Sequence, residues 1–147
     1  IYEELDDRTV ATLATVGDDG LPQITAVYYT VDEDFVMSFA TKKKTKKYEN
    51  IQKNNKVQML VYDEKTQLAI QITGEAQEIS GRKLKEKIIE HMYWIASQND
   101  YESPPISKLY AGDYVAYQVL PKRISMAFYL RPQKGGHDMF EVLNFEE

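Results

Sequence analysis

The feature that most constrains the fold of this chain is a series of short apolar, β-branched runs that alternate with polar turn signals. Residues 9–16 form the first run. Residues 17–20 follow it, and the sequence of these four residues, Gly-Asp-Asp-Gly, is typical of a tight hairpin turn. The acidic residues 32–34 separate the next two runs in the same way. Because these links are short, the first three runs are predicted to pair as an antiparallel sheet.

Several further runs continue this pattern to the end of the chain. The segments predicted as strands are residues 9–16, 23–31, 35–41, 57–62, 67–79, 113–120, 123–130 and 139–145. Gly74 lies inside one of the longest runs and predicts a bend or bulge, which barrel corners require. Residues 101–110 contain two adjacent prolines and are predicted to be a loop or a short helical turn.

Two segments interrupt the strands with helical patterns. Residues 45–54 are predicted to form a helix, with Thr45 as its N-cap and two asparagines at its end. Residues 80–97 have a helical period, and their apolar face consists of Leu84, Ile88, Met92 and Ile95. Many short strands with two helices predict a mainly β fold, a small closed or half-closed antiparallel barrel. No linker is visible, so residues 1–147 are expected to be one domain.

Composition limits the classes of function. Among 147 residues there is no cysteine and there are only two histidines, so a metal site is poorly supplied and none is predicted. A net charge of −5 argues against a general nucleic-acid binder. No apolar run approaches the ~20 residues of a membrane span, and no secretory signal is visible, so a cytoplasmic protein is expected. Eleven tyrosines exceed the needs of a core, which predicts that some line a pocket or an interface.

One segment breaks a local rule of charge. Five of the six residues 42–47 are lysine, and they lie where a predicted strand passes into a predicted helix. A helix N-terminus is itself partly positive, so lysines are misplaced there unless an anion lies among them. This placement, with Thr41 and Thr45 beside it, predicts a phosphate site. A solvated loop is the alternative, and Lys42, Lys43 and Lys44 are the members expected to be solvated in either case.

These residues resemble a known family in their order and spacing. The segments that carry the resemblance are residues 11–16 (Ala-Thr-Leu-Ala-Thr-Val), the Asp-Gly turn, residues 21–23 (Leu-Pro-Gln), residues 27–29 (Val-Tyr-Tyr), residues 39–41 (Phe-Ala-Thr), residues 45–47 (Thr-Lys-Lys), residues 50–51 and residues 54–57. Over residues 8–79 the chain is similar to the pyridoxamine 5′-phosphate oxidase-like, FMN-binding split-barrel superfamily. Its most specific part is the strand–Thr–three residues–Thr–Lys–Lys–helix pattern.

The resemblance implies an FMN site at the interface of a homodimer. It implies that Thr41, Thr45, Lys46 and Lys47 bind the flavin phosphate, with Ala40 beside them in the cofactor site. It places the isoalloxazine ring along the second strand, at Thr25, Ala26, Val27 and Tyr28, and only one of Tyr28 and its neighbour Tyr29 can face the ring because side chains of a strand alternate. It assigns the pyrimidine edge to a glutamine, either Gln67 or Gln71.

The chain departs from a true pyridoxamine phosphate oxidase. An arginine that opens the second strand and a lysine that closes it are replaced by Thr25 and Thr30, and Arg131 and His137 do not fall into the C-terminal substrate pattern. Oxidation of vitamin B6 phosphates is therefore not expected, and the resemblance is to the small general-stress type.

The resemblance leaves the activity open. Two functions are compatible with it: an FMN-dependent oxidoreductase, or a non-catalytic flavin- or ligand-binding module such as a redox sensor. A deazaflavin or heme could replace FMN in the same barrel. No side chain is assigned as a catalytic acid or base. Trp94, near the end of the long helix, is expected to pack against the barrel, and a role at an interface is the alternative.

Overall fold

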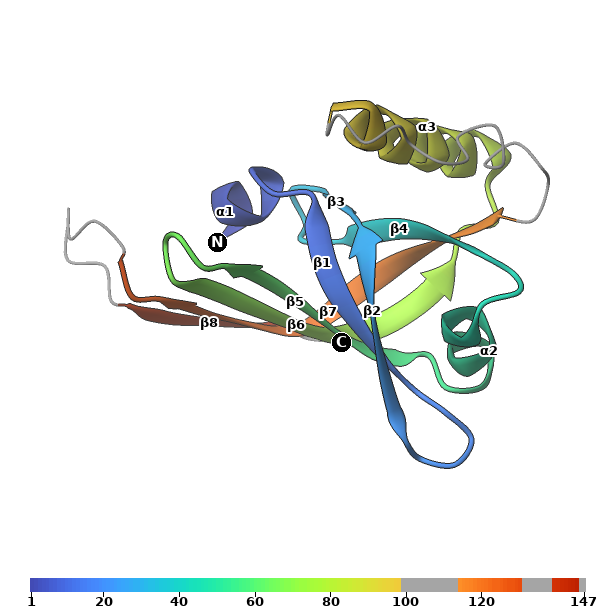
Figure 1. Ribbon diagram of the computed structural model, residues 1–147, viewed down its shortest axis with the longest axis horizontal. Coiled ribbons are helices and arrows are strands. Elements are labelled where there is room, and N and C mark those ends of the chain that lie inside the picture. Colours follow the sequence, from blue (N-terminus) through green and yellow to red (C-terminus); the bar gives the residue numbers. More distant parts are fainter. Residues whose placement is uncertain (99–113, 131–138, 146–147) are drawn as a thin grey trace.

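The computed structural model describes residues 1–98, 114–130 and 139–145. Within these segments, eight strands form one sheet and three helices lie against it (Figure 1). The elements are α1 (Tyr2–Asp6), β1 (Val10–Val16), β2 (Pro22–Tyr28), β3 (Thr30–Val31), β4 (Met37–Lys42), α2 (Lys46–Lys53), β5 (Lys56–Asp63), β6 (Leu68–Glu78), α3 (Arg82–Gln98), β7 (Tyr114–Phe128) and β8 (Phe140–Asn144).

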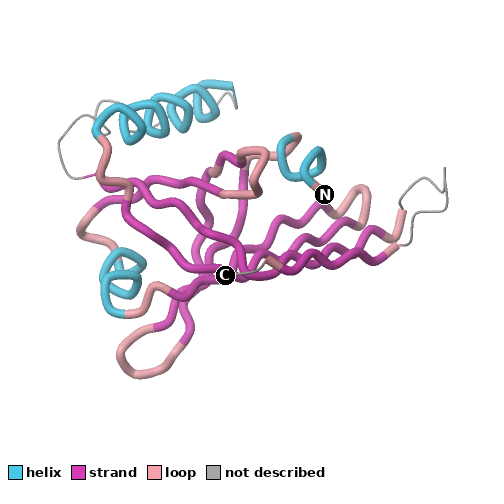
Figure 2. The backbone as a smooth tube through the Cα atoms, turned by 180° about the vertical axis from the view of Figure 1, so that it is seen from behind, coloured by secondary structure: helices cyan, strands magenta, loops and turns pink. Residues whose placement is uncertain are grey.

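The sheet is antiparallel throughout and curls into a half-barrel. Its strands follow the order β2-β1-β5-β6-β7-β4-β3, and β8 pairs with β7. The curl brings β2 close to β4, although no ladder of hydrogen bonds joins them. Both views place α1 and α2 at opposite ends of this half-barrel (Figure 1, Figure 2). The predicted mainly β, split-barrel fold is confirmed.

The long strand β7 differs from the sequence-based expectation of two strands at residues 113–120 and 123–130. Pro121 lies at the predicted break, and it falls opposite Gly74 of β6, where the register of the ladder shifts. A Cβ on Gly74 would lie 2.4 Å from the carbonyl oxygen of Leu120, so only glycine fits. The bulge predicted at Gly74 thus accommodates the proline within one continuous strand. One half of β7 can then pair with β4 and the other half with β8.

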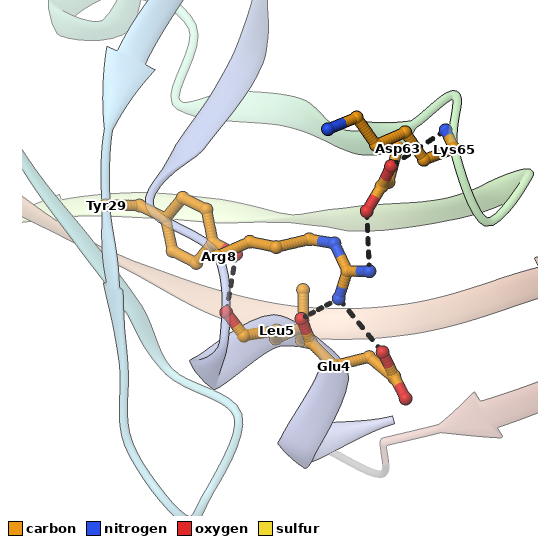
Figure 3. A network of polar contacts seen from close by, with 6 residues as sticks. All are labelled: Glu4, Leu5, Arg8, Tyr29, Asp63 and Lys65. Carbon is orange, nitrogen blue, oxygen red and sulfur yellow. Dashed lines mark hydrogen bonds and ion pairs between the residues drawn. The ribbon is translucent and has the colours of Figure 1, made fainter. Parts of the chain in front are cut away.

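The N-terminal helix α1 was not predicted, and a polar network fixes it to the barrel (Figure 3). The guanidinium of Arg8 donates to the carboxylate of Glu4 and to that of Asp63, at 2.9 Å each. The hydroxyl of Tyr29 donates to the carbonyl oxygen of Leu5 at 2.6 Å. The hydrogen bond from Arg8 lowers the pKa of the Asp63 carboxyl. These contacts join α1 to the turn between β5 and β6 and to the segment after β2.

The core fills the inside of the half-barrel, and a second, smaller cluster lies between α3 and the outside of the sheet. Ile88 and Met92 of α3 pack there on Ala116 of β7, with Ala40 and Tyr28 at the edge. Ile95 of the predicted helical face is also buried, whereas Leu84 is 40% exposed. The predicted loop at residues 101–110, with Arg131 and His137, lies outside the described residues.

Candidate functional site

The candidate site is the junction between β4 and α2, where Thr45 is the N-cap of the helix as predicted. Its hydroxyl accepts the backbone N–H of Tyr48 at 3.3 Å and lies 2.8 Å from the carbonyl oxygen of Lys42, to which it donates. The hydroxyl of Thr41, which is 3% exposed, lies 3.2 Å from that of Thr45. Because the Thr45 proton is used by Lys42, the Thr41 hydroxyl is left to donate to Thr45.

This geometry assigns different tasks to the predicted phosphate residues. The two threonine protons are committed inside the protein, so Thr41 and Thr45 shape the turn. The donors that remain are the backbone N–H groups of Lys46 and Lys47, which begin α2 and have no partner inside the helix. A helix that begins in this way attracts an anion through these groups and through its dipole.

The lysines of the junction have unequal surroundings. Lys46 is exposed and lies 3.6 Å from Glu49. Lys47 is partly buried, and burial lowers the pKa of its ammonium group. Among the described residues, no carboxylate lies within ion-pair distance of Lys47. A partly desolvated cation without a counter-ion is costly, so Lys47 is the side chain most suited to an anionic ligand.

The remaining lysines lie outside this arrangement. Lys43 and Lys44 are exposed, as predicted for solvated members of the run. Lys42 was also expected to be solvated, but it is partly buried, with its ammonium group 5.7 Å from the ring centre of Tyr114. A cation over an aromatic face is stabilised by the ring quadrupole, and the sequence held no local sign of this pairing.

Strand β2, along which the isoalloxazine ring is predicted to lie, is on the same side of the barrel as the junction. Ala40 and Tyr28 contact the same cluster under α3, so β2 and β4 meet there. Ala26 is exposed, Thr25 is partly buried, and Val27 points into the core, where only its backbone could meet a ligand. Tyr29 is buried within the barrel, so Tyr28 is the tyrosine of this pair that faces outward.

The two candidate glutamines do not reach the junction within one chain. Gln71 lies on β6 opposite Leu60 and Ser125, seven residues from the end of β6 nearest to β4, which corresponds to about 20 Å of strand. Gln67 lies further along, in the turn before β6, with φ of +53°. Both glutamines therefore lie away from the end of β6 that is nearest to β4.

Helix α2 is held rigidly by polar side chains that composition and motifs did not reveal as functional. The amide of Asn50, which is buried, donates to the hydroxyl of Thr15 at 3.0 Å and to the carbonyl of Gln23 at 3.3 Å. Gln52 donates to the hydroxyl of Tyr117 at 2.9 Å, and burial raises the pKa of that tyrosine to about 12. A buried asparagine on a helix face is a signal of such anchoring, because it needs partners.

The described residues show neither a metal site nor a membrane-spanning helix. Residues 1–98, 114–130 and 139–145 contain no group of three His, Asp or Glu side chains that could hold a metal ion. In the same segments, none of the helices has the length and apolarity to cross a bilayer.

Comparison with known proteins places the fold. No curated protein matches this chain. Among solved structures, an F420 reductase is 28% identical with a TM-score of 0.65, covering 84% of this chain and 94% of its own. The general stress protein 26 of Bacillus anthracis str. Sterne is 24% identical with a TM-score of 0.62, covering 85% and 89%. A heme binding protein from Mycobacterium smegmatis is 15% identical with a TM-score of 0.64, covering 92% and 52%.

The same family was expected from the β4–α2 pattern. A family model described as pyridoxamine 5′-phosphate oxidase matches residues 1–127, which include the whole of β4, α2 and the ring strand. The chain therefore belongs to the pyridoxamine 5′-phosphate oxidase family.

Proposed function

We propose that this protein binds FMN at the N-terminus of α2 and uses it as a cytoplasmic, homodimeric oxidoreductase. The observation that carries the proposal is Lys47, a partly buried ammonium group with no counter-ion among the described residues, beside two helix N–H groups without intrahelical partners. A phosphate satisfies all three groups at once, because it offers several acceptor oxygens and a negative charge.

The residues around the junction fit the rest of the cofactor. Ala26 is exposed and leaves room beside the backbone of β2 for a flat ring, and Tyr28, two residues further along the same face, offers an aromatic edge. When bound, FMN would supply two-electron redox chemistry. The protein would orient the ring and shield it from water through α3 and the strand edge. No described side chain is assigned as an acid or base.

A homodimer would complete the site. The outer face of β2, β1, β5 and β6 carries the exposed side chains Ile24, Val10 and Tyr62, and Gln71 shares this face. Exposed apolar groups on one sheet face favour a self-complementary interface. Gln71 of one copy could then reach the cofactor held by Lys47 of the other.

The alternatives share the phosphate site. An F420 reductase is among the similar structures, and a deazaflavin also carries a phosphate that the junction could hold. Heme is less well supplied: His91 is exposed on α3, where its ring stacks on Trp94 and away from the junction. A non-catalytic sensor would bind FMN equally well, and fold does not separate it from an enzyme.

The first test is an absorbance spectrum of the purified protein, followed by titration of the flavin-free form with FMN. We expect flavin bands or saturable quenching of FMN fluorescence, while a Soret band or the absence of FMN binding would contradict the proposal. Oxidation of a reduced nicotinamide in the presence of an electron acceptor would separate an oxidoreductase from a sensor.

The second test addresses the shared site. Lys47→Met and Gln71→Ala should each lose most FMN binding. When the two variants are unfolded, mixed and refolded together, mixed dimers carry one doubly altered site and one intact site, so about a quarter of all sites should recover. No recovery, with both variants folded and dimeric, would show that each protomer builds its own site.

A further inference from the structure

A second concave site lies on the far side of α3 from the phosphate junction. It is a cleft of about 650 Å³ between α3 on one side and α1 with β3 on the other. Figure 1 shows α3 crossing above β4, with its C-terminal end directed toward α1. The volume is in the range of small-molecule sites. Its apolar walls are Leu5, Val31, Val36, Leu84, Ile88 and Trp94.

The α3 wall of the cleft carries an aromatic platform. The rings of His91 and Trp94 stack with their centres 5.7 Å apart and an angle of 29° between their planes. Trp94 was expected to pack against the barrel, but it is 56% exposed. The residues of α3 that line the cleft recur at helical spacing, so an apolar and aromatic stripe faces it where solvated charges would be usual.

The floor of the cleft carries polar groups that are available for a ligand. Ser38 of β4 is 5% exposed, lines the cleft and pairs across the sheet with Gln118 of β7, which also lines it. Because Ser38 lines the cleft, its hydroxyl can donate a hydrogen bond to the polar edge of a ligand or accept one from it.

The charges around the cleft disfavour an anion. Arg8 faces it, but its charge is paired with Glu4 and Asp63 through the two terminal nitrogens, while its buried Nε has no partner among the described residues. That leaves Lys87, with His91 as a titratable neighbour, against three carboxylates. The carboxylates that line the cleft are Asp6, Asp32 and Glu90.

The cleft and the phosphate junction share one strand. The outward side chains of β4 are Ser38, Ala40 and Lys42, so four residues, or about 13 Å, separate the cleft floor from the junction. Ile88 and Met92 of α3 cover Ala40 between them. The contact of α3 with Ala40 therefore separates the cleft from the phosphate junction on this face of β4.

From these observations we propose that the cleft binds a planar aromatic or heteroaromatic molecule without negative charge. The molecule stacks on Trp94 and His91 and places its polar edge at Ser38 and Gln118. Binding itself does not need the flavin. Only the role of this molecule as the redox substrate rests on the proposed function. In that role, the substrate would be an uncharged or cationic ring and not a phosphorylated one.

The fluorescence of Trp94 provides the test, because it is the single tryptophan of the chain. Flavin-free protein is titrated with three pyridines of similar shape: the N-methylnicotinamide cation, neutral nicotinamide and the nicotinate anion. We expect saturable quenching by the first two and binding of nicotinate roughly tenfold weaker or more. Quenching that rises linearly and does not distinguish the three probes would refute the cleft as a binding site.

Matched variants locate the binding. By calorimetry, Trp94→Ala should weaken nicotinamide binding by roughly tenfold, and Ser38→Ala should weaken it several-fold. Tyr129→Ala removes a similarly exposed aromatic ring outside the cleft and should leave binding unchanged. An equal loss in Tyr129→Ala would refute the assignment.

The two proposals fail separately. Lys47→Met should weaken FMN binding by roughly ten- to 150-fold and leave nicotinamide binding to the flavin-free protein intact. If FMN binds but the pyridines do not, the cleft proposal is wrong and the cofactor proposal stands. If the pyridines bind but FMN does not, the cleft remains a site and its role as a flavin substrate site is refuted.

Discussion

Replacing Lys47 by methionine should move ligand affinity and protein stability in opposite directions. Methionine keeps the apolar stem of the side chain and removes only the ammonium group. A charge-assisted contact to phosphate is worth about 1.5–3 kcal/mol, so the dissociation constant for FMN should rise by roughly ten- to 150-fold. The stability of the flavin-free protein should increase, because the variant no longer buries a cation without a counter-ion among the described residues.

The size of the stability gain follows from the surroundings of Lys47. The side chain is only partly buried, so solvent still screens much of its charge, and the gain should stay near the lower end of what single stabilising changes give, about 0.5–1 kcal/mol. Lys43→Met is the matched control, because it removes the same charge from an exposed position two residues before Thr45. It should change neither quantity appreciably.

The pH dependence of stability tests separately whether Lys47 destabilises the flavin-free protein. Burial lowers the pKa of Lys47 below its ordinary value of 10.5, so the unfolded chain holds this proton more tightly than the folded one. Stability therefore rises with pH across this interval, and the cost of the buried charge is full at neutral pH and vanishes above 10.5. Urea unfolding of the flavin-free protein should show the advantage of Lys47→Met over wild type shrinking as the pH rises toward 10.5. A variant less stable than wild type at pH 7, or an unchanged FMN affinity, would refute the argument.

Two further changes test how the barrel is built. Gly74→Ala should destabilise the protein by about 2–3 kcal/mol in chemical unfolding, because the new Cβ meets the backbone oxygen of Leu120, which cannot rotate away; a loss below about 0.5 kcal/mol would mean that the bulge relaxes freely. Gln67→Gly should raise the free energy of unfolding by about 0.5–1 kcal/mol, because glycine removes the left-handed strain at φ of +53° and returns only part of the gain through unfolded-chain entropy. A fall in stability would show that the Gln67 side chain makes a contact that outweighs this strain.

The elements that local patterns predicted well are those whose signals are themselves local. Thr45 caps α2 because its hydroxyl meets the backbone three residues later, and that spacing is written in the sequence. Ile88, Met92 and Ile95 are buried because helical periodicity places them on one face. Gly74 also predicted a bulge locally, because only a residue without a side chain permits the close approach of β7.

The elements that were mispredicted depend on contacts between distant segments. Pro121 reads locally as a break, and only its position opposite Gly74 allows β7 to continue. Helix α1 is too short to signal itself and is fixed through Arg8 to Asp63, 55 residues away. Trp94 was expected to be packed because large apolar side chains usually are, but the neighbouring strands leave a cleft there. For the same reason no local pattern indicates this cleft, because its lining residues come from five separate elements: α1, β3, β4, α3 and β7.

The six residues of strand β4 contribute to the core with one face and to the proposed ligand sites with the other. Its inward side chains, Met37, Phe39 and Thr41, are all buried. Its outward side chains alternate with them: Ser38 faces the cleft, Ala40 contacts α3, and Lys42, next to the phosphate junction, lies over the ring of Tyr114. A slip of the β4–β7 register by one residue would exchange the two sets and place Lys42 in the core. The pairing with β7 that keeps the core dry is therefore the same pairing that would set the distance between a bound phosphate and a ring in the cleft, so changes that loosen this ladder should impair both sites together.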